Sequence, residues 1–237
     1  MRASPESHAL ARVDNWPAET PAVGVTRAGG VLDTRGPVDQ RSTLASVTKL
    51  LTTLAVLVAV EEGTLNLEDP GGPVGSSVAH LLAHASGLGA EGGIVRPPGE
   101  RRIYSNAGFE LLGEILEERH GIPYETYVSE AVLQPLGMTS TTAKGSPASG
   151  ALGTVNDLLA LGRELLNPTL VSASTLGRAT SPAFPGLAGV LPGFGPRAPN
   201  DWGLGFELRD GKSPHWTGSS NSPSTFGHFG RSGSFLW

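Results

Sequence analysis

The segment 50–60 narrows the range of folds more than any other part of this chain, because only Thr52 and Thr53 interrupt its apolar side chains. The segment is too short to cross a bilayer, which requires about 20 apolar residues in a helix. A helix that is apolar on almost every side is typical of the middle of a folded domain. We therefore predict one buried helix over residues 46–62, ended by Gly63.

Shorter patterns predict strands near both ends of the chain and helices between them. Alternating apolar residues around a Gly29–Gly30 turn indicate a hairpin. The predicted strands cover 21–27, 31–34, 202–208 and 225–237, and the predicted helices cover 4–14, 77–86, 107–120, 124–134 and 156–167, the last with Asn156 or Thr154 as its N-cap. Residues 181–200 are rich in Pro and Gly, so we expect a long irregular loop there that helps to form a pocket.

This order of elements predicts a fold of the α+β class, arranged as an α/β sandwich. We expect one domain over residues 1–237, with an antiparallel sheet built from the N- and C-terminal segments and flanked by helices. Residues 1–60 and 200–237 would supply the sheet and the central helix. Residues 61–199 would supply a mostly helical lobe and the pocket loops.

The composition argues against several classes of protein. The net charge is -5 and the sequence has no cluster of Lys and Arg, which argues against nucleic-acid binding. The sequence has no Cys, so disulfides, thiolate nucleophiles and cysteine-based zinc sites are excluded. The N-terminal sequence has no apolar signal region and no segment is long enough for a membrane span, so we expect a cytoplasmic location.

Ser46 and Lys49 form the first of three short motifs that carry chemistry. Residues i and i+3 lie on one face of a helix, so the hydroxyl and the amine can meet there. A lysine that loses hydration on an apolar helix favours its neutral form and can activate a serine nucleophile. The competing interpretation is an N-capping serine and a solvated lysine, because chance alone gives about 0.3 such pairs in this composition.

The second motif is Tyr104-Ser105-Asn106. In an extended segment, residues i and i+2 point the same way, so Tyr104 and Asn106 can line one wall of a site. A tyrosine can carry a proton, and an amide can hold both the lysine and a substrate carbonyl. The competing interpretation is a turn before a helix, with Asn106 as the N-cap.

The third motif is His228-Phe229-Gly230, followed by Arg231. A glycine at the end of a strand allows the backbone to approach a ligand closely. The competing interpretation is a glycine-rich strand end that carries a surface histidine.

Taken together and in this order, the three motifs resemble those of serine β-lactamases and D-Ala-D-Ala peptidases, namely S-x-x-K, then Tyr/Ser-x-Asn, then K-T-G. The Tyr-Ser-Asn form is most similar to class C β-lactamases and their esterase and peptidase relatives. The resemblance extends over about residues 20–237 and includes four further segments, at 81–88, 101–118, 133–141 and 202–208. It implies a β-lactamase/transpeptidase-like fold.

The resemblance also implies roles for individual residues. Ser46 would attack a carbonyl and form an acyl-enzyme, and Lys49 with Tyr104 would take and return the proton. The sequence leaves open which of these two groups is the base. Asn106 would orient the substrate. The oxyanion hole would be formed by the backbone N–H groups of Ser46 and Arg231, with His228 and Gly230 on the substrate-binding strand.

The sequence departs from the family pattern in two places. His228 stands where β-lactamases and peptidases usually have Lys, and a histidine is mostly neutral near pH 7, so weaker binding of a substrate carboxylate is expected. The sequence also ends at Trp237, where family members continue with two strands and a C-terminal helix. The expectation is a fold that lacks these elements and exposes a strand edge.

Three functions follow from this reasoning. The favoured function is an esterase-like serine hydrolase that acts on small-molecule ester, amide or β-lactam substrates without a cofactor or metal. The first alternative is a β-lactamase or D-alanyl-D-alanine carboxypeptidase, and the second is a truncated, non-catalytic binding module.

His80 and His84 have the spacing of a zinc pair but lack a third ligand, so a structural role is predicted. The sequence does not indicate an oligomeric state.

Overall fold

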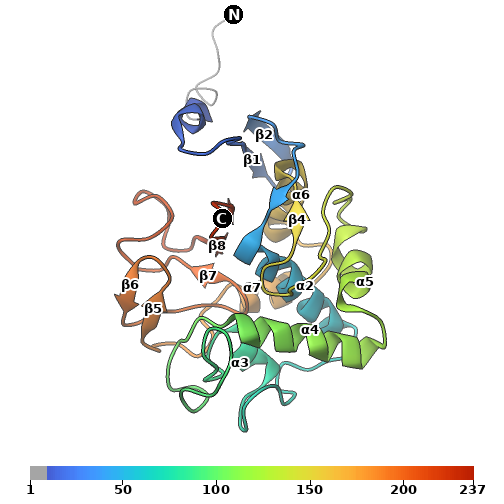
Figure 1. Cartoon of the computed structure of the whole chain (residues 1–237), viewed down its shortest axis with the longest axis vertical. Helices are drawn as coiled ribbons and strands as arrows, with labels where there is room; N and C mark the ends of the chain where they lie inside the picture. Colours follow the sequence, from blue (N-terminus) through green and yellow to red (C-terminus); the bar gives the residue numbers. More distant parts are fainter. Residues whose placement is uncertain (1–9) are drawn as a thin grey trace, which may run out of the picture.

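The computed structural model describes residues 10–237, so most of the helix predicted over 4–14 lies outside the described residues. The described part of that segment forms a short 3₁₀ turn, η1 (Ala11–Asn15). The chain then forms a hairpin, the central helix, a region rich in helices and, at its end, short strands (Figure 1).

The central helix α2 (Thr48–Glu61) is buried from Thr48 to Ala59. It contacts α4 (Asn106–His120) and α5 (Tyr124–Val128), which cover it from the helical part of the molecule (Figure 1). The burial on all sides confirms the prediction made from the apolar segment 50–60. This helix is the scaffold on which the candidate site is built.

The prediction of one continuous helix over 46–62 is corrected at its start. Ser46 lies in a 3₁₀ turn, η2 (Ala45–Val47), and the α-helix begins at Thr48. The φ angle of Ala45 is 46°, a left-handed conformation that regular helices do not contain. Ser46 therefore lies in the first turn, where backbone N–H groups have no partner within an α-helix.

Two of the predicted helices are shorter or less regular than expected. The helix predicted over 77–86 is α3 (Val78–Leu82), because His84 adopts a φ of 54° and the backbone cannot remain helical there. The segment predicted as a helix over 124–134 begins as α5 and continues as a π-helical turn over Ser129–Leu133.

The N-caps of the longer helices follow side-chain chemistry. The hydroxyl of Ser105 caps α4 by accepting a hydrogen bond from the N–H of Gly108. Thr154, one of the two predicted caps, caps α6 (Val155–Leu166) in the same way. A further helix, α7 (Ala173–Ala179), was not predicted.

The strands pair as four small antiparallel sheets, whereas one sheet was expected. Their bounds are β1 (Val23–Arg27) with β2 (Gly30–Arg35), β3 (Ser42–Thr43) with β4 (Leu152–Gly153), β5 (Gly189–Leu191) with β6 (Gly195–Arg197), and β7 (Glu207–Leu208) with β8 (Phe226–Phe229) and β9 (Phe235–Leu236). Side chains of β1 and β9 both pack against α6 at Gly162. A Cβ at Gly162 would lie 3.2 Å from Thr26 Cγ2 and 3.6 Å from Leu236 Cδ1.

The segment 181–200 is less irregular than predicted, because it contains the hairpin β5–β6. Gly189 of β5 forms a bridge with Arg102, two residues before Tyr104. This segment therefore packs beside the second motif. Among residues 10–237, no helix is long and apolar enough to cross a membrane.

Candidate active site

Ser46 and Lys49 meet at the start of the central helix. Lys49 Nζ lies 3.4 Å from Ser46 Oγ, 2.8 Å from Asn106 Oδ1 and 2.9 Å from the backbone oxygen of Ala148. The lysine is fully buried, and the structure records no capping hydrogen bond from a side chain at the start of α2. The alternative of a capping serine with a solvated lysine is therefore wrong.

Burial makes Lys49 an unusual lysine. Loss of hydration lowers the pKa of Lys49 to about 7, although the negative charges of Glu110 and Glu91 partly oppose this shift. The Nζ atom also lies 4.8 Å from the centre of the Tyr104 ring and 5.4 Å from that of Phe109. At neutral pH an amine in this setting can both accept and donate a proton.

The second motif contributes its two outer side chains to the same site. Burial raises the pKa of Tyr104 to about 12, although a hydrogen bond with Ser46 opposes the shift. The structure corrects the alternative in which Asn106 is the N-cap, because Ser105 occupies that position. The amide of Asn106 is therefore free to accept a hydrogen bond from Lys49.

His228 on β8 is fully buried, which rules out the alternative of a surface histidine. Desolvation and the nearby charge of Lys49 lower the pKa of His228 to about 3, so the ring is neutral. Its Nδ1 lies 2.9 Å from both backbone polar atoms of Phe229, and its buried Nε2 has no partner among the described residues. The ring centre lies 6.0 Å from that of Tyr104.

Gly230 and Arg231 lie beside the segment that precedes Ser46. A Cβ at Gly230 would lie 2.7 Å from the backbone oxygen of Leu44 and 3.0 Å from Ala45 Cβ, so only glycine fits without a shift. Ser234 Oγ donates a hydrogen bond of 2.5 Å to the same Leu44 oxygen. The Arg231 side chain is exposed, and its backbone N–H has no hydrogen-bond partner among the described residues.

An aromatic wall completes the site and was missed from the sequence. His84 is buried, with its ring centre 4.6 Å from that of Tyr104 and 4.8 Å from that of Trp202. His84 Nδ1 accepts a hydrogen bond from the N–H of Ser105, which fixes the second motif. The segments 81–88 and 202–208 supported the family resemblance, and they were not connected with the site. His80 instead stacks on Phe184.

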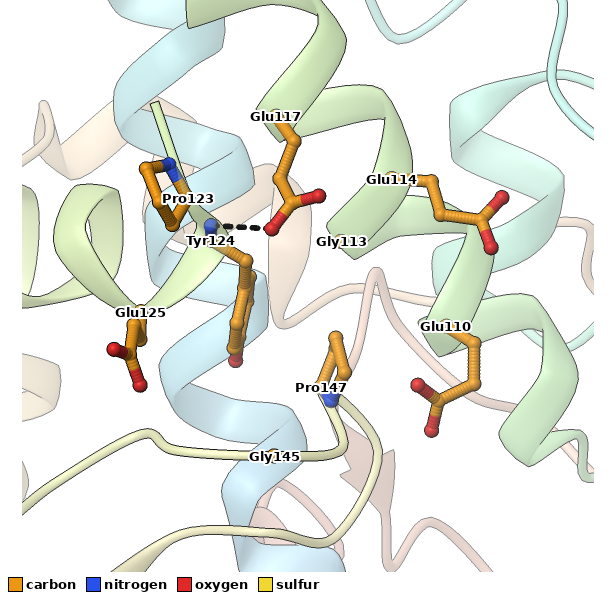
Figure 2. A pocket seen from close by; sticks show the side chains of 9 residues that line it. All are labelled: Glu110, Gly113, Glu114, Glu117, Pro123, Tyr124, Glu125, Gly145 and Pro147. Carbon is orange, nitrogen blue, oxygen red and sulfur yellow. Dashed lines mark hydrogen bonds between the residues drawn. The ribbon is translucent and has the colours of Figure 1, made fainter. Parts of the chain in front are cut away.

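A hollow lies between α4, the start of α5 and the loop at Gly145 and Pro147 (Figure 2). It has a volume of about 290 Å³ and is lined by glutamates of α4 and α5, the ring of Tyr124 and the loop at Gly145 and Pro147. None of the predicted site residues lines it. The same loop continues to Ala148, which holds Lys49, so the loop separates the acidic hollow from the amine.

The fold and these motifs define a class of enzyme, the serine hydrolases with a Ser-x-x-Lys motif at the start of a buried helix. The family model described as Beta-lactamase matches residues 19–237, and the chain belongs to that family. It accordingly has the β-lactamase/transpeptidase-like fold of a family of serine hydrolases, as the sequence predicted.

The chain is similar to several known proteins. A β-lactamase structure from Mycobacterium bovis is 51% identical, with a TM-score of 0.94 over 96% of this chain and 85% of that one. The D-alanyl-D-alanine-carboxypeptidase/endopeptidase AmpH of Escherichia coli is 29% identical over 52% of this chain and 42% of its own length. A D-stereospecific amidohydrolase from Streptomyces shares the fold, with a TM-score of 0.67 at 20% identity. The chain thus spans less than half the length of the curated relative AmpH.

Proposed function

We propose that the chain hydrolyses small carboxylic esters through an acyl-enzyme on Ser46, with Lys49 as the general base. The observation that carries the proposal is a lysine whose pKa is about 7, with its Nζ 3.4 Å from Ser46 Oγ. A base is most effective when its pKa lies near the working pH. Lys49 takes the hydroxyl proton as Ser46 Oγ attacks the carbonyl carbon.

The remaining steps use groups already in the site. The backbone N–H groups of Ser46 and Arg231 stabilise the oxyanion of the tetrahedral intermediate. Tyr104, whose pKa is about 12, stays protonated and relays the proton from Lys49 to the leaving alkoxide. Water then attacks the acyl carbon as Lys49 takes its proton. Lys49 returns that proton to Ser46 Oγ as the acyl–oxygen bond breaks, which releases the acid and restores the Ser46 hydroxyl.

The chemistry of the third motif favours esters over β-lactams. The carboxylate of a β-lactam is stabilised by a fixed cation in the K-T-G motif, whereas His228 is buried and neutral. An ester of an uncharged acid needs no such cation. The second candidate, a β-lactamase or D-alanyl-D-alanine carboxypeptidase, is favoured by the 51% identical β-lactamase and by the similarity to AmpH.

The test compares the chain with its Ser46→Ala variant on p-nitrophenyl acetate and on a chromogenic cephalosporin. The proposal predicts ester turnover that disappears in Ser46→Ala, with little cleavage of the cephalosporin. Rapid cephalosporin cleavage would establish the second candidate instead. Activity that survives in Ser46→Ala would overturn the nucleophile.

The intact mass of the protein after mixing with the ester separates a third candidate, the non-catalytic binding module. A stable acetyl adduct that forms once per chain, with no further release of p-nitrophenol, would show acylation without turnover. Unmodified protein that continues to release p-nitrophenol would support the hydrolase.

A further inference from the structure

The loop before the second motif carries a carboxylate to the edge of the site. The backbone oxygen of Ala90 accepts hydrogen bonds from the N–H groups of Asn106 (2.8 Å) and Ala107 (3.2 Å). The backbone oxygen of Gly89 accepts a hydrogen bond of 2.7 Å from Ser105 Oγ. These bonds fix the loop to the start of α4, so the next residue, Glu91, has a defined place.

Glu91 is joined to the reacting groups through one amide. Its Oε1 accepts a hydrogen bond of 2.8 Å from Asn106 Nδ2, and the Oδ1 of the same amide accepts one of 2.8 Å from Lys49. The charge of Glu91 opposes the lowering of the Lys49 pKa by burial and adds to the rise of the Tyr104 pKa.

No basic side chain among residues 10–237 forms an ion pair with Glu91. Arg102, the nearest arginine along the chain to Tyr104, is buried and donates its hydrogen bonds to backbone carbonyls, including Asn200 O and Ala183 O. His228 is neutral. The Glu91 carboxylate is therefore exposed and has no ion-pair partner in the described part of the chain.

We propose that Glu91 selects substrates by their charge. Its carboxylate disfavours acyl groups that carry a carboxylate near the scissile bond and favours neutral or cationic ones. This inference rests on the proposed esterase function and adds the class of substrate. Glu91 would act as a specificity residue and would also hold the Asn106 amide in the orientation that presents Oδ1 to Lys49. Removal of its charge should leave that orientation intact if the replacement can still accept a hydrogen bond.

The expected size of the effect follows from Coulomb's law. If a substrate charge is assumed to lie about 8 Å from the Glu91 carboxylate, an effective dielectric constant of about 20 to 40 gives a change in the rate ratio of about 5-fold to 30-fold. Salt should shrink the effect, because the Debye length falls from about 30 Å at 0.01 M to about 3 Å at 1 M.

The experiment compares Glu91→Gln with the full wild-type chain on three p-nitrophenyl esters. One carries a neutral acetyl group, one an anionic succinyl group and one a cationic 4-trimethylammoniobutyryl group. Glutamine keeps an oxygen that can accept from Asn106, so mainly the charge changes. Glu118→Gln is the matched control. This variant removes one exposed carboxylate from the far end of α4, the helix that begins at Asn106. At a rise of 1.5 Å per residue, Glu118 lies about 18 Å from Asn106.

The measured quantity is the ratio of kcat/KM between two esters, which cancels any general loss of activity. Glu91→Gln should raise the succinyl-to-acetyl ratio by about 5-fold to 30-fold at low salt and lower the cationic-to-acetyl ratio. The change should shrink at 1 M salt, and Glu118→Gln should leave both ratios within twofold of wild type. Equal ratios in wild type and Glu91→Gln, with normal acetyl ester turnover, would overturn the proposed role of Glu91 and leave the proposed ester hydrolysis standing. No Ser46-dependent cleavage of any ester would overturn the proposed function and the inference with it.

Discussion

Replacing Lys49 with arginine would keep a cation beside Ser46 and remove the neutral amine. With a pKa of about 7, about half of the Lys49 side chains are neutral at pH 7 and about nine-tenths at pH 8. A lysine at its ordinary pKa would be neutral in about one molecule in three thousand at pH 7. An arginine stays protonated throughout this range.

The wild-type kcat/KM for p-nitrophenyl acetate should therefore rise with pH through a midpoint near 7 and level off by about pH 8.5. The sign follows from the role of Lys49, because the active form is the deprotonated one. Lys49→Arg should lose about 10² to 10⁴ of kcat/KM at pH 8, which is the usual contribution of a general base. Burial lowers the pKa of Lys49 and therefore this midpoint, and the charges of Glu110 and Glu91 partly oppose the shift.

The assay follows p-nitrophenol release between pH 5.5 and 9, with the Ser46→Ala variant subtracted as a blank for spontaneous hydrolysis. Circular dichroism and a melting curve check that Lys49→Arg remains folded. A wild-type rate that stays flat or falls between pH 6 and 8 would refute the reasoning. So would a folded Lys49→Arg enzyme that keeps more than a tenth of the activity.

Two further predictions concern the third motif. Gly230→Ala should lower kcat/KM at least tenfold, because its Cβ would lie 2.7 Å from the Leu44 oxygen and push the segment that precedes Ser46. Gly211→Ala, where a Cβ meets no atom within 4 Å, is the control and should retain wild-type activity in the same ester assay. Because burial lowers the pKa of His228 to about 3, the unfolded chain binds the extra proton between about pH 6.5 and 3, and folding stability falls as the pH falls through this window. Urea unfolding at pH 7 and pH 4 should show a smaller loss in His228→Asn than in wild type, by about 3 kcal/mol, and equal losses would contradict the burial argument.

Several features of this protein were determined by sequence alone. The segment 50–60 is apolar on almost every side, and a helix of that kind is typical of the middle of a fold. The three motifs identified the family because their order and spacing are characteristic, and the family model and the 51% identical structure agree with them. Local chemistry also predicted Thr154 as the cap of α6, because a cap depends on residues within one turn.

The tertiary structure decided which alternative held at each motif. Ser105 and Asn106 both have side chains that cap helices, and the choice between them depends on Gly89, whose backbone oxygen also binds the Ser105 hydroxyl. The burial of Lys49 depends on Ala148, about 100 residues further along the chain, which closes over the amine. No pattern within a single segment contains these long-range contacts.

The electrostatic character of the site is also a product of the fold. A lysine and a histidine have ordinary pKa values near 10.5 and 6.5 in an extended chain, and here they fall to about 7 and about 3. Desolvation is the largest cause in both cases, and it arises only when distant segments exclude water together. The sequence thus determined which groups this chain carries, and the packing of α2, α4 and β8 around them decided their protonation, because burial is a property of the assembled chain.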